Sequence, residues 1–97
     1  MRTPDTLLAR RRGIEARPFA QGLLLVDIDT GQCYQLNRVG AEIWGLLERP
    51  LGLADICAEV AKSYRRGSDA IETDVRNLVS ALVRERLVEA RLAEERS

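Results

Sequence analysis

The sequence predicts an α+β domain of winged helix-turn-helix type, in which a three-stranded antiparallel sheet is followed by three helices. Three observations predict it. An apolar run over residues 22–28 meets an Asp-Thr-Gly turn signal at 29–31, and a strand-like run covers 32–36. Amphipathic segments follow, and Gly-Ser-Asp at 67–69 separates the last two of them. With 97 residues, one domain is the default.

Composition limits the possible partners and chemistry. The formal net charge is +0 with 31% charged residues, which argues against a polyanion as the main partner. The chain has no histidine, which removes Ser-His and Cys-His nucleophile pairs and the commonest metal ligand. No segment approaches the roughly 20 apolar residues that span a bilayer. Because the N-terminus also lacks the apolar core of a signal peptide, we predict a cytoplasmic protein.

The N-terminal segment 1–12 is predicted to be flexible, with a Thr-Pro-Asp turn signal and three consecutive arginines at 10–12. This basic run is typical of a solvated tail; a contact for an acidic partner is the alternative. The folded domain is predicted over residues 13–90. Its first strand, 13–19, is predicted at an edge of the sheet, because Pro18 cannot donate to a ladder on both sides.

The second strand, 22–28, is predicted to be central. Leu24, Val26 and Ile28 share one face, while Leu23 and Leu25 share the other, which is compatible with cover on both faces near its start. The loop at 29–31 suits a three-residue hairpin, since a glycine in its last position can take a positive φ.

The third strand, 32–36, is the first functional clue. It contains neither a charged residue nor a proline, whereas Pro18 and charged side chains protect the first strand. Proteins usually blunt the exposed edges of their sheets, because unpaired backbone groups there accept another strand. The sequence therefore predicts one edge that is open to a further strand.

Three helices are predicted over 38–48, 53–65 and 70–86. Asn37 is the expected N-cap of the first, and Asp69 with Glu72 has capping-box spacing at the start of the third. Trp44 is expected in the core or at its rim rather than stacked on a ligand. Leu87 and Val88 are predicted to fold back onto the core, and a charged tail, 91–97, is predicted to fray.

No chemical motif predicts catalysis. Cys33 and Cys57 are too few for a zinc site and lack a CxxC spacing, so two ordinary small residues, buried or half-buried, are expected. Asp27 and Asp29 could form a catalytic carboxylate pair, but their place at a hairpin favours a solvated turn. We predict no enzyme activity, no cofactor and no metal site.

Two binding functions remain. DNA recognition would use the third helix, yet its three arginines at 76, 84 and 86 are balanced by three carboxylates at 72, 74 and 85, a net charge of 3 − 3 = 0. Peptide binding by strand addition to the third strand is favoured instead. The broad apolar face of the third helix would then line a groove in part; the alternative is that this whole face is core.

The order of these motifs resembles the PqqD family over residues 14–90. That family includes the RiPP recognition elements, small winged-helix proteins that bind leader peptides of ribosomally made, modified peptides. The sequence departs from the family pattern at Val39, where threonine is frequent, and at 51–53; both positions affect helix capping more than binding. The resemblance is carried by Tyr34 to Asn37, Gly40, Ile43, Trp44, Asp74, Val75, Leu78 and Leu82.

The resemblance implies that a leader peptide adds as a strand between the third strand and the third helix. It also implies a separate cysteine protease of lasso-peptide biosynthesis as the partner, or alternatively a radical-SAM enzyme. The site residues that it implies are Gln32, Cys33, Tyr34, Gln35 and Leu36 on the strand, and Asp74, Val75, Leu78, Val79 and Leu82 on the helix.

Overall fold

The computed structural model describes residues 6–64 and 68–92, apart from the side chains of 68, 69 and 92. The side chain of Asp69, the predicted capping residue, and the tail beyond 92 therefore lie outside the described part. In chain order the elements are β1 (Thr6–Arg10), β2 (Ile14–Phe19), β3 (Gly22–Asp27), β4 (Cys33–Leu36), α1 (Arg38–Leu46), β5 (Leu51–Gly52), α2 (Leu53–Ser63), α3 (Ser68–Arg84) and β6 (Val88–Leu92).

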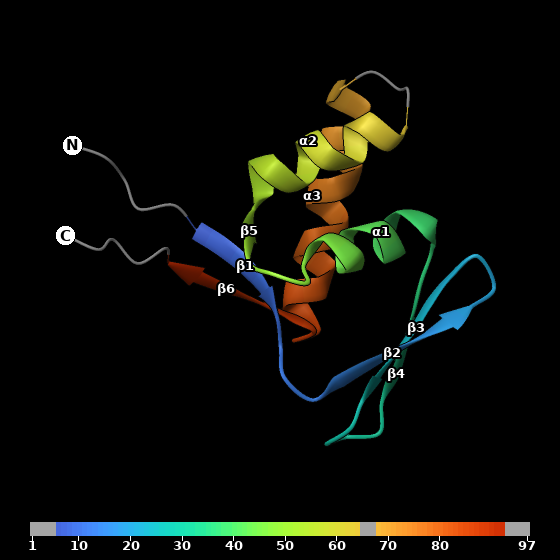
Figure 1. The fold of residues 1–97 in the computed structure, drawn as a ribbon. Coiled ribbons are helices and arrows are strands. Elements are labelled where there is room, and N and C mark those ends of the chain that lie inside the picture. The colour runs from blue at the N-terminus through green and yellow to red at the C-terminus, as the bar shows by residue number, and fades with distance from the viewer. Residues whose placement is uncertain (1–5, 65–67, 93–97) are drawn as a thin grey trace.

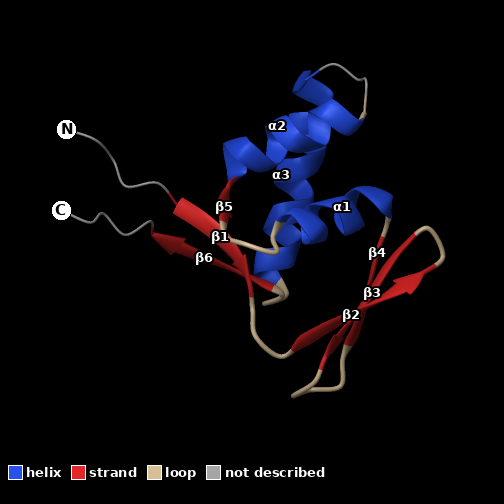
Figure 2. Ribbon diagram, in the orientation of Figure 1, coloured by secondary structure: helices blue, strands red, loops and turns tan. Residues whose placement is uncertain are grey.

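Two antiparallel sheets enclose the helices from different sides (Figures 1 and 2). One has the strand order β2-β3-β4, and the other has the order β5-β1-β6. Helix α1 contacts β3 and β4, whereas α2 contacts β1 and α3 contacts β6. The predicted α+β fold, with its β2-β3-β4 sheet and three following helices, is confirmed.

The prediction that residues 1–12 are flexible is wrong for residues 6–10. They form β1, the central strand of the second sheet, and Leu8 and Ala9 are buried. One partner of β1 is β6, in the register Leu8↔Ala90, more than 80 residues further along the chain. Local patterns cannot predict such a distant pairing. The same pairing corrects the start of the predicted charged tail, 91–97, because Arg91 belongs to β6.

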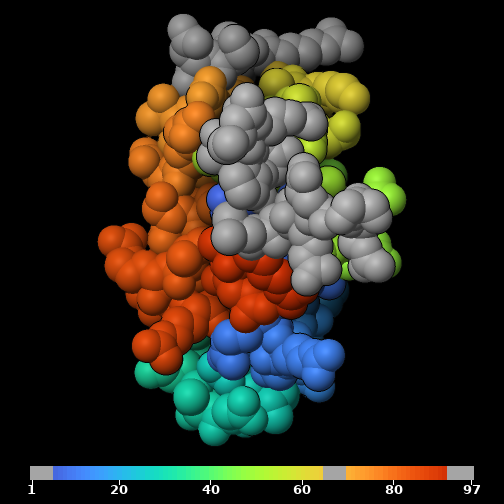
Figure 3. Space-filling view, turned by 90° about the vertical axis from the view of Figure 1, so that its left-hand side faces the viewer, coloured from blue at the N-terminus to red at the C-terminus, as the bar shows by residue number. Residues whose placement is uncertain are grey.

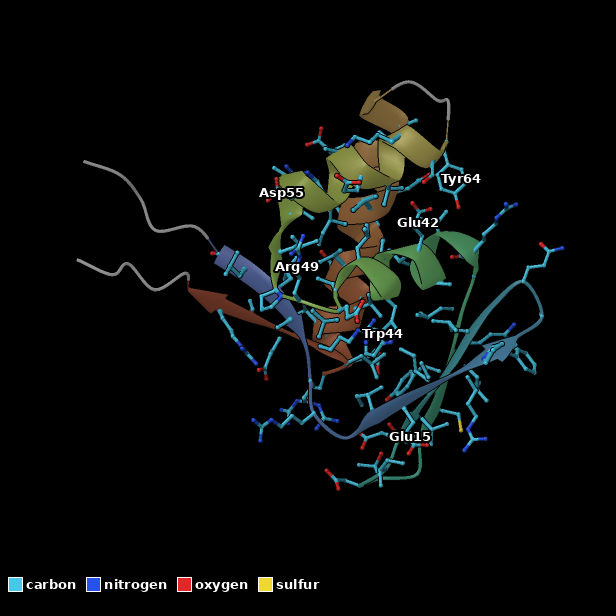
Figure 4. The ribbon with its side chains drawn as sticks, in the orientation of Figure 1. Glu15, Glu42, Trp44, Arg49, Asp55 and Tyr64 are labelled. Atoms are coloured by element: carbon cyan, nitrogen blue, oxygen red, sulfur yellow. The ribbon has the colours of Figure 1, made fainter. Side chains whose placement is uncertain are left out.

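The first two arginines of the basic run, Arg10 at the end of β1 and Arg11 after it, make intramolecular contacts instead of forming a solvated tail. The guanidinium carbon of Arg10 lies 4.8 Å from the centroid of the Trp44 ring, and its Nε donates to the Trp44 carbonyl at 3.0 Å. Trp44 is buried and projects from α1 toward the interior (Figure 4), which confirms the predicted core position.

The register of the first sheet assigns each strand an inner and an outer face. Leu25 pairs with Tyr34, and Leu23 pairs with Leu36, on the face that the helices cover. The other face is open: Ile28 just beyond β3 is 55% exposed, and Glu15 extends from β2 away from the helices (Figure 4). Leu24 and Val26, on this outer face of β3, are half-buried, so the predicted cover on the second face is partial.

Helix α3 ends in a Schellman motif. Arg86 has a φ of 62°, its N–H donates to the carbonyl of Val83, and the N–H of Leu87 donates to the carbonyl of Leu82. This reversal places Leu87 and Val88 in the core at 2% exposure each, as predicted.

Arg11 joins three segments that are distant in sequence. Its Nη2 lies 2.6 Å from a carboxylate oxygen of Asp27, its Nε donates to the carbonyl of Arg86, and its backbone N–H donates to the carbonyl of Leu87. Figure 3 shows the β1–β2 connection (blue) between the red end of α3 with β6 and the teal β3–β4 turn. Arg11 thus connects the two sheets at the C-terminal end of α3.

Asp27 organises the hairpin turn rather than forming a solvated pair with Asp29. One of its carboxylate oxygens accepts the backbone N–H groups of Asp29 and Thr30, and the residue is only 7% exposed. Burial is the largest single influence and would raise the pKa of Asp27. The two backbone donors and Arg11 together outweigh it, so the pKa lies below its usual range.

This lowered pKa predicts acid sensitivity. Because the folded state favours the charged form of Asp27, its stabilising effect is complete above the unfolded pKa of about 3.9 and is lost as the pH falls through the lower folded value. We expect Asp27→Asn to reduce stability at pH 6 and to flatten the loss of stability below about pH 4. Urea unfolding from pH 6 to pH 3 measures both. Asp29→Asn, on the same turn, is the control; an unchanged acid slope in Asp27→Asn would contradict the assignment.

Candidate functional site

Strand β4 has a free edge. It pairs with β3 on one side, and no described strand pairs with its other side. The backbone N–H of Asp27 donates to the carbonyl of Gln32 at 2.9 Å. From this pair, the residues of β3 and β4 that are hydrogen-bonded to each other alternate along the strands. The N–H and C=O groups of Cys33 and Gln35 therefore point away from β3. The edge offers two donors and two acceptors to a further strand.

One face of α3 lies beside this edge. Leu78, Ala81 and Glu85 follow one another at helical spacings of three and four residues, so they share a stripe. Between the stripe and β4 is a groove of about 360 Å³. Its lining residues are Cys33, Tyr34, Gln35, Leu36, Leu78, Ala81, Leu82, Glu85 and Leu87.

A second depression of about 370 Å³ continues the groove toward the start of α1. Leu78 lines both depressions, and the second is otherwise lined by polar side chains and Val39. Asn37 stands at this junction because it caps α1: its side-chain oxygen accepts the N–H of Gly40 at 2.9 Å, as predicted. The remaining lining residues are Asp74 and Asn77.

The end of the groove near the β3–β4 turn is polar. The Tyr34 hydroxyl donates to the side-chain oxygen of Gln32, and Glu85 lines the same groove. Desolvation, followed by the charge of Glu85, raises the pKa of Tyr34, so the phenol stays protonated at neutral pH and remains a donor.

The structure brings most of the predicted site residues together. Cys33, Tyr34, Gln35 and Leu36 line the groove from the strand, and Leu78 and Leu82 line it from the helix. Asp74 lines the adjoining depression.

Three predicted site residues lie elsewhere. Gln32 precedes β4 and helps to build the turn. Val75 and Val79 are 0% and 6% exposed and belong to the core, because this side of α3 faces the other helices and the sheet. On the surface of α3 they lie next to the Leu78–Ala81–Glu85 stripe. The apolar pattern of α3 therefore does not distinguish the residues of the core from those of the groove.

The prediction missed Ala81, Glu85 and Leu87 in the groove, and Asn77 beside it. A signal for two of them was present: Ala81 and Glu85 follow Leu78 at i+3 and i+7, on the same face as Asp74. Ala81 is also the smallest side chain in this part of the stripe, which leaves room between helix and strand.

The described residues contain no group of three or more His, Cys, Asp or Glu side chains that could hold a metal ion. Cys33 and Cys57 are both free thiols. Cys57 is half-buried, as predicted, whereas Cys33 is exposed, because its side chain lies on the outer face of β4. None of the helices in the described part combines the length and apolar character needed to cross a bilayer.

The fold and the groove define a small α+β domain with a free strand edge beside a partly apolar helix face. The chain belongs to the PqqD family: the model described as coenzyme PQQ synthesis protein D matches residues 22–88. This confirms the family resemblance. No curated protein matches the chain.

Solved structures share the fold at low sequence identity. TbiB1 in complex with the TbiA(beta) leader peptide is 23% identical with a TM-score of 0.69, covering 92% of this chain and 99% of that one. A lasso peptide synthetase B1 complexed with the leader peptide is 24% identical with a TM-score of 0.69, covering 84% and 95%. The PqqD truncation of Methylobacterium extorquens PqqCD, a RiPP recognition element, is 16% identical with a TM-score of 0.69, covering 86% and 88%.

Proposed function

We propose that this chain is a non-catalytic adaptor that binds the leader of a ribosomally made precursor peptide. The leader adds as a strand to the free edge of β4 and covers the Leu78–Ala81–Glu85 stripe of α3. The observation that carries the proposal is the outward direction of the Cys33 and Gln35 backbone groups beside an apolar groove.

Family membership supports this proposal. Two of the structurally similar proteins are complexes with leader peptides, and the third is a RiPP recognition element. The groove also suits an extended peptide: the strand edge supplies main-chain bonds, and Leu36, Leu78 and Leu82 supply an apolar surface for alternate side chains.

The adaptor would present its bound leader to a separate processing enzyme. We propose a cysteine protease that removes the leader in lasso-peptide biosynthesis, because one of the similar structures is a lasso peptide synthetase B1 complexed with the leader peptide. The PqqD likeness favours a second candidate, a partner of a radical-SAM peptide-modifying enzyme.

A direct binding experiment tests the proposal. The probe is the synthetic leader of a short precursor peptide encoded beside the gene for this chain, titrated against the full chain by calorimetry. We expect saturable binding in the nanomolar to micromolar range. Duplex DNA is titrated in parallel at two salt concentrations. Steeply salt-dependent DNA binding without leader binding would replace the adaptor with a DNA-binding regulator.

Leu78→Ala should weaken leader binding about tenfold, because a half-buried leucine that the ligand covers contributes roughly 1.4 kcal/mol. Calorimetry gives the affinity, and thermal unfolding checks that the variant is folded. Val83→Ala is the matched control, since Val83 is 37% exposed on the same helix and lines no part of this groove. Equal affinities for the two variants would remove α3 from the binding site.

A further inference from the structure

The groove is anionic, although the whole chain has a formal net charge of +0. Of the described residues that line the groove and the adjoining depression, the charged ones are Glu85 and Asp74, and none is a lysine or arginine. Two nearby arginines pair with other carboxylates: Arg11 binds Asp27, and Arg76 binds Glu72 at 2.9 Å. Glu85 therefore has no lysine or arginine beside it among the residues that line the groove.

The direction of α3 adds to this charge. Glu85 follows the last residue of the helix, where the aligned peptide dipoles carry a partial negative charge. The Schellman motif satisfies the carbonyls of Leu82 and Val83 but leaves the dipole in place. The Tyr34 phenol, whose pKa the charge of Glu85 helps to raise, is neutral. A cationic side chain that binds here would place a full positive charge opposite Glu85.

We propose that the groove selects a leader strand with a lysine or arginine opposite Glu85 and an apolar residue two positions away, against Leu78 and Ala81. This inference rests on the proposed function and names the class of peptide that the same site takes. The separation of two residues between the basic and the apolar position follows from strand geometry, because only alternate side chains of an added strand face the helix.

A positional-scanning library of N-acetylated 12-residue peptides, based on the synthetic leader above, tests the rule by fluorescence anisotropy. We expect lysine or arginine to be preferred at one position and an apolar residue two positions away. For a peptide with lysine at that position, Glu85→Gln should weaken binding about threefold at low salt and Glu85→Lys about tenfold. Glu85→Lys should also bind the peptide with glutamate at that position more tightly than the wild-type chain does.

Glu59→Lys is the control, because it makes the same change of net charge on an exposed part of α2. It should leave the affinity for every peptide unchanged. Peptides that bind equally well with lysine, norleucine or glutamate at every position would overturn the charge rule while leaving leader binding intact. Absence of binding by all peptides, including the native leader, would instead reject the proposed function.

Discussion

Proline at both Cys33 and Gln35 should weaken leader binding at least thirtyfold without unfolding the chain. Each substitution removes an N–H that points away from β3, so the β3–β4 ladder keeps its hydrogen bonds. The added strand loses two bonds of about 1 kcal/mol each, and the proline rings also obstruct its approach. Calorimetric titration with the leader measures the affinity, and far-UV circular dichroism with thermal unfolding checks the fold.

Ala16→Pro is the control for this experiment. Gly13 accepts the N–H of Ile28, so the hydrogen-bonded residues of β2 alternate from Gly13, and the N–H of Ala16 also points away from β3. Pro18 already occupies an equivalent position on that edge. The control should bind the leader as the native chain does. A folded double-proline variant with undiminished affinity would rule out strand addition to β4.

Gly22→Ala should lower the free energy of unfolding by about 3 kcal/mol. A Cβ at Gly22 would lie 1.8 Å from the carbonyl oxygen of Leu36 and 2.9 Å from the carbonyl carbon of Asn37. The start of β3 and the β4–α1 junction would have to move apart, and such overpacking costs 1–3 kcal/mol or more. In a small domain this is a large share of the total stability. Urea unfolding measures the change.

Gly45→Ala provides the comparison, because a Cβ there meets no atom within 4 Å and the residue lies in helix α1. We expect unchanged stability or a gain of up to about 1 kcal/mol. The clash at Gly22 also reaches the site, since Leu36 lines the groove and Asn37 caps α1. Native-like stability of Gly22→Ala would mean that β3 and α1 tolerate a wider separation than the structure shows.

The site illustrates how far a sequence can be interpreted. The open edge was predictable, because a strand without charge or proline is visible in the sequence itself. The rotation of α3 was not. Val75, Leu78, Val79 and Leu82 are all apolar at helical spacing, yet Val75 and Val79 are core while Leu78 lines the groove. A broad apolar face defines an arc, and only the packing partners decide which part of it remains uncovered.

The sequence by itself determined the β2-β3-β4 hairpins, the Asn37 cap, three helices and the return of Leu87 into the core. These features depend on contacts between near neighbours, on alternation with period two or on helical spacing. Only the tertiary structure decided that β1 joins β6, that Arg11 connects the two sheets, and that Glu85 stands at the end of the groove. These arrangements join residues far apart in the chain, and their free energy comes from pairings that no local pattern specifies.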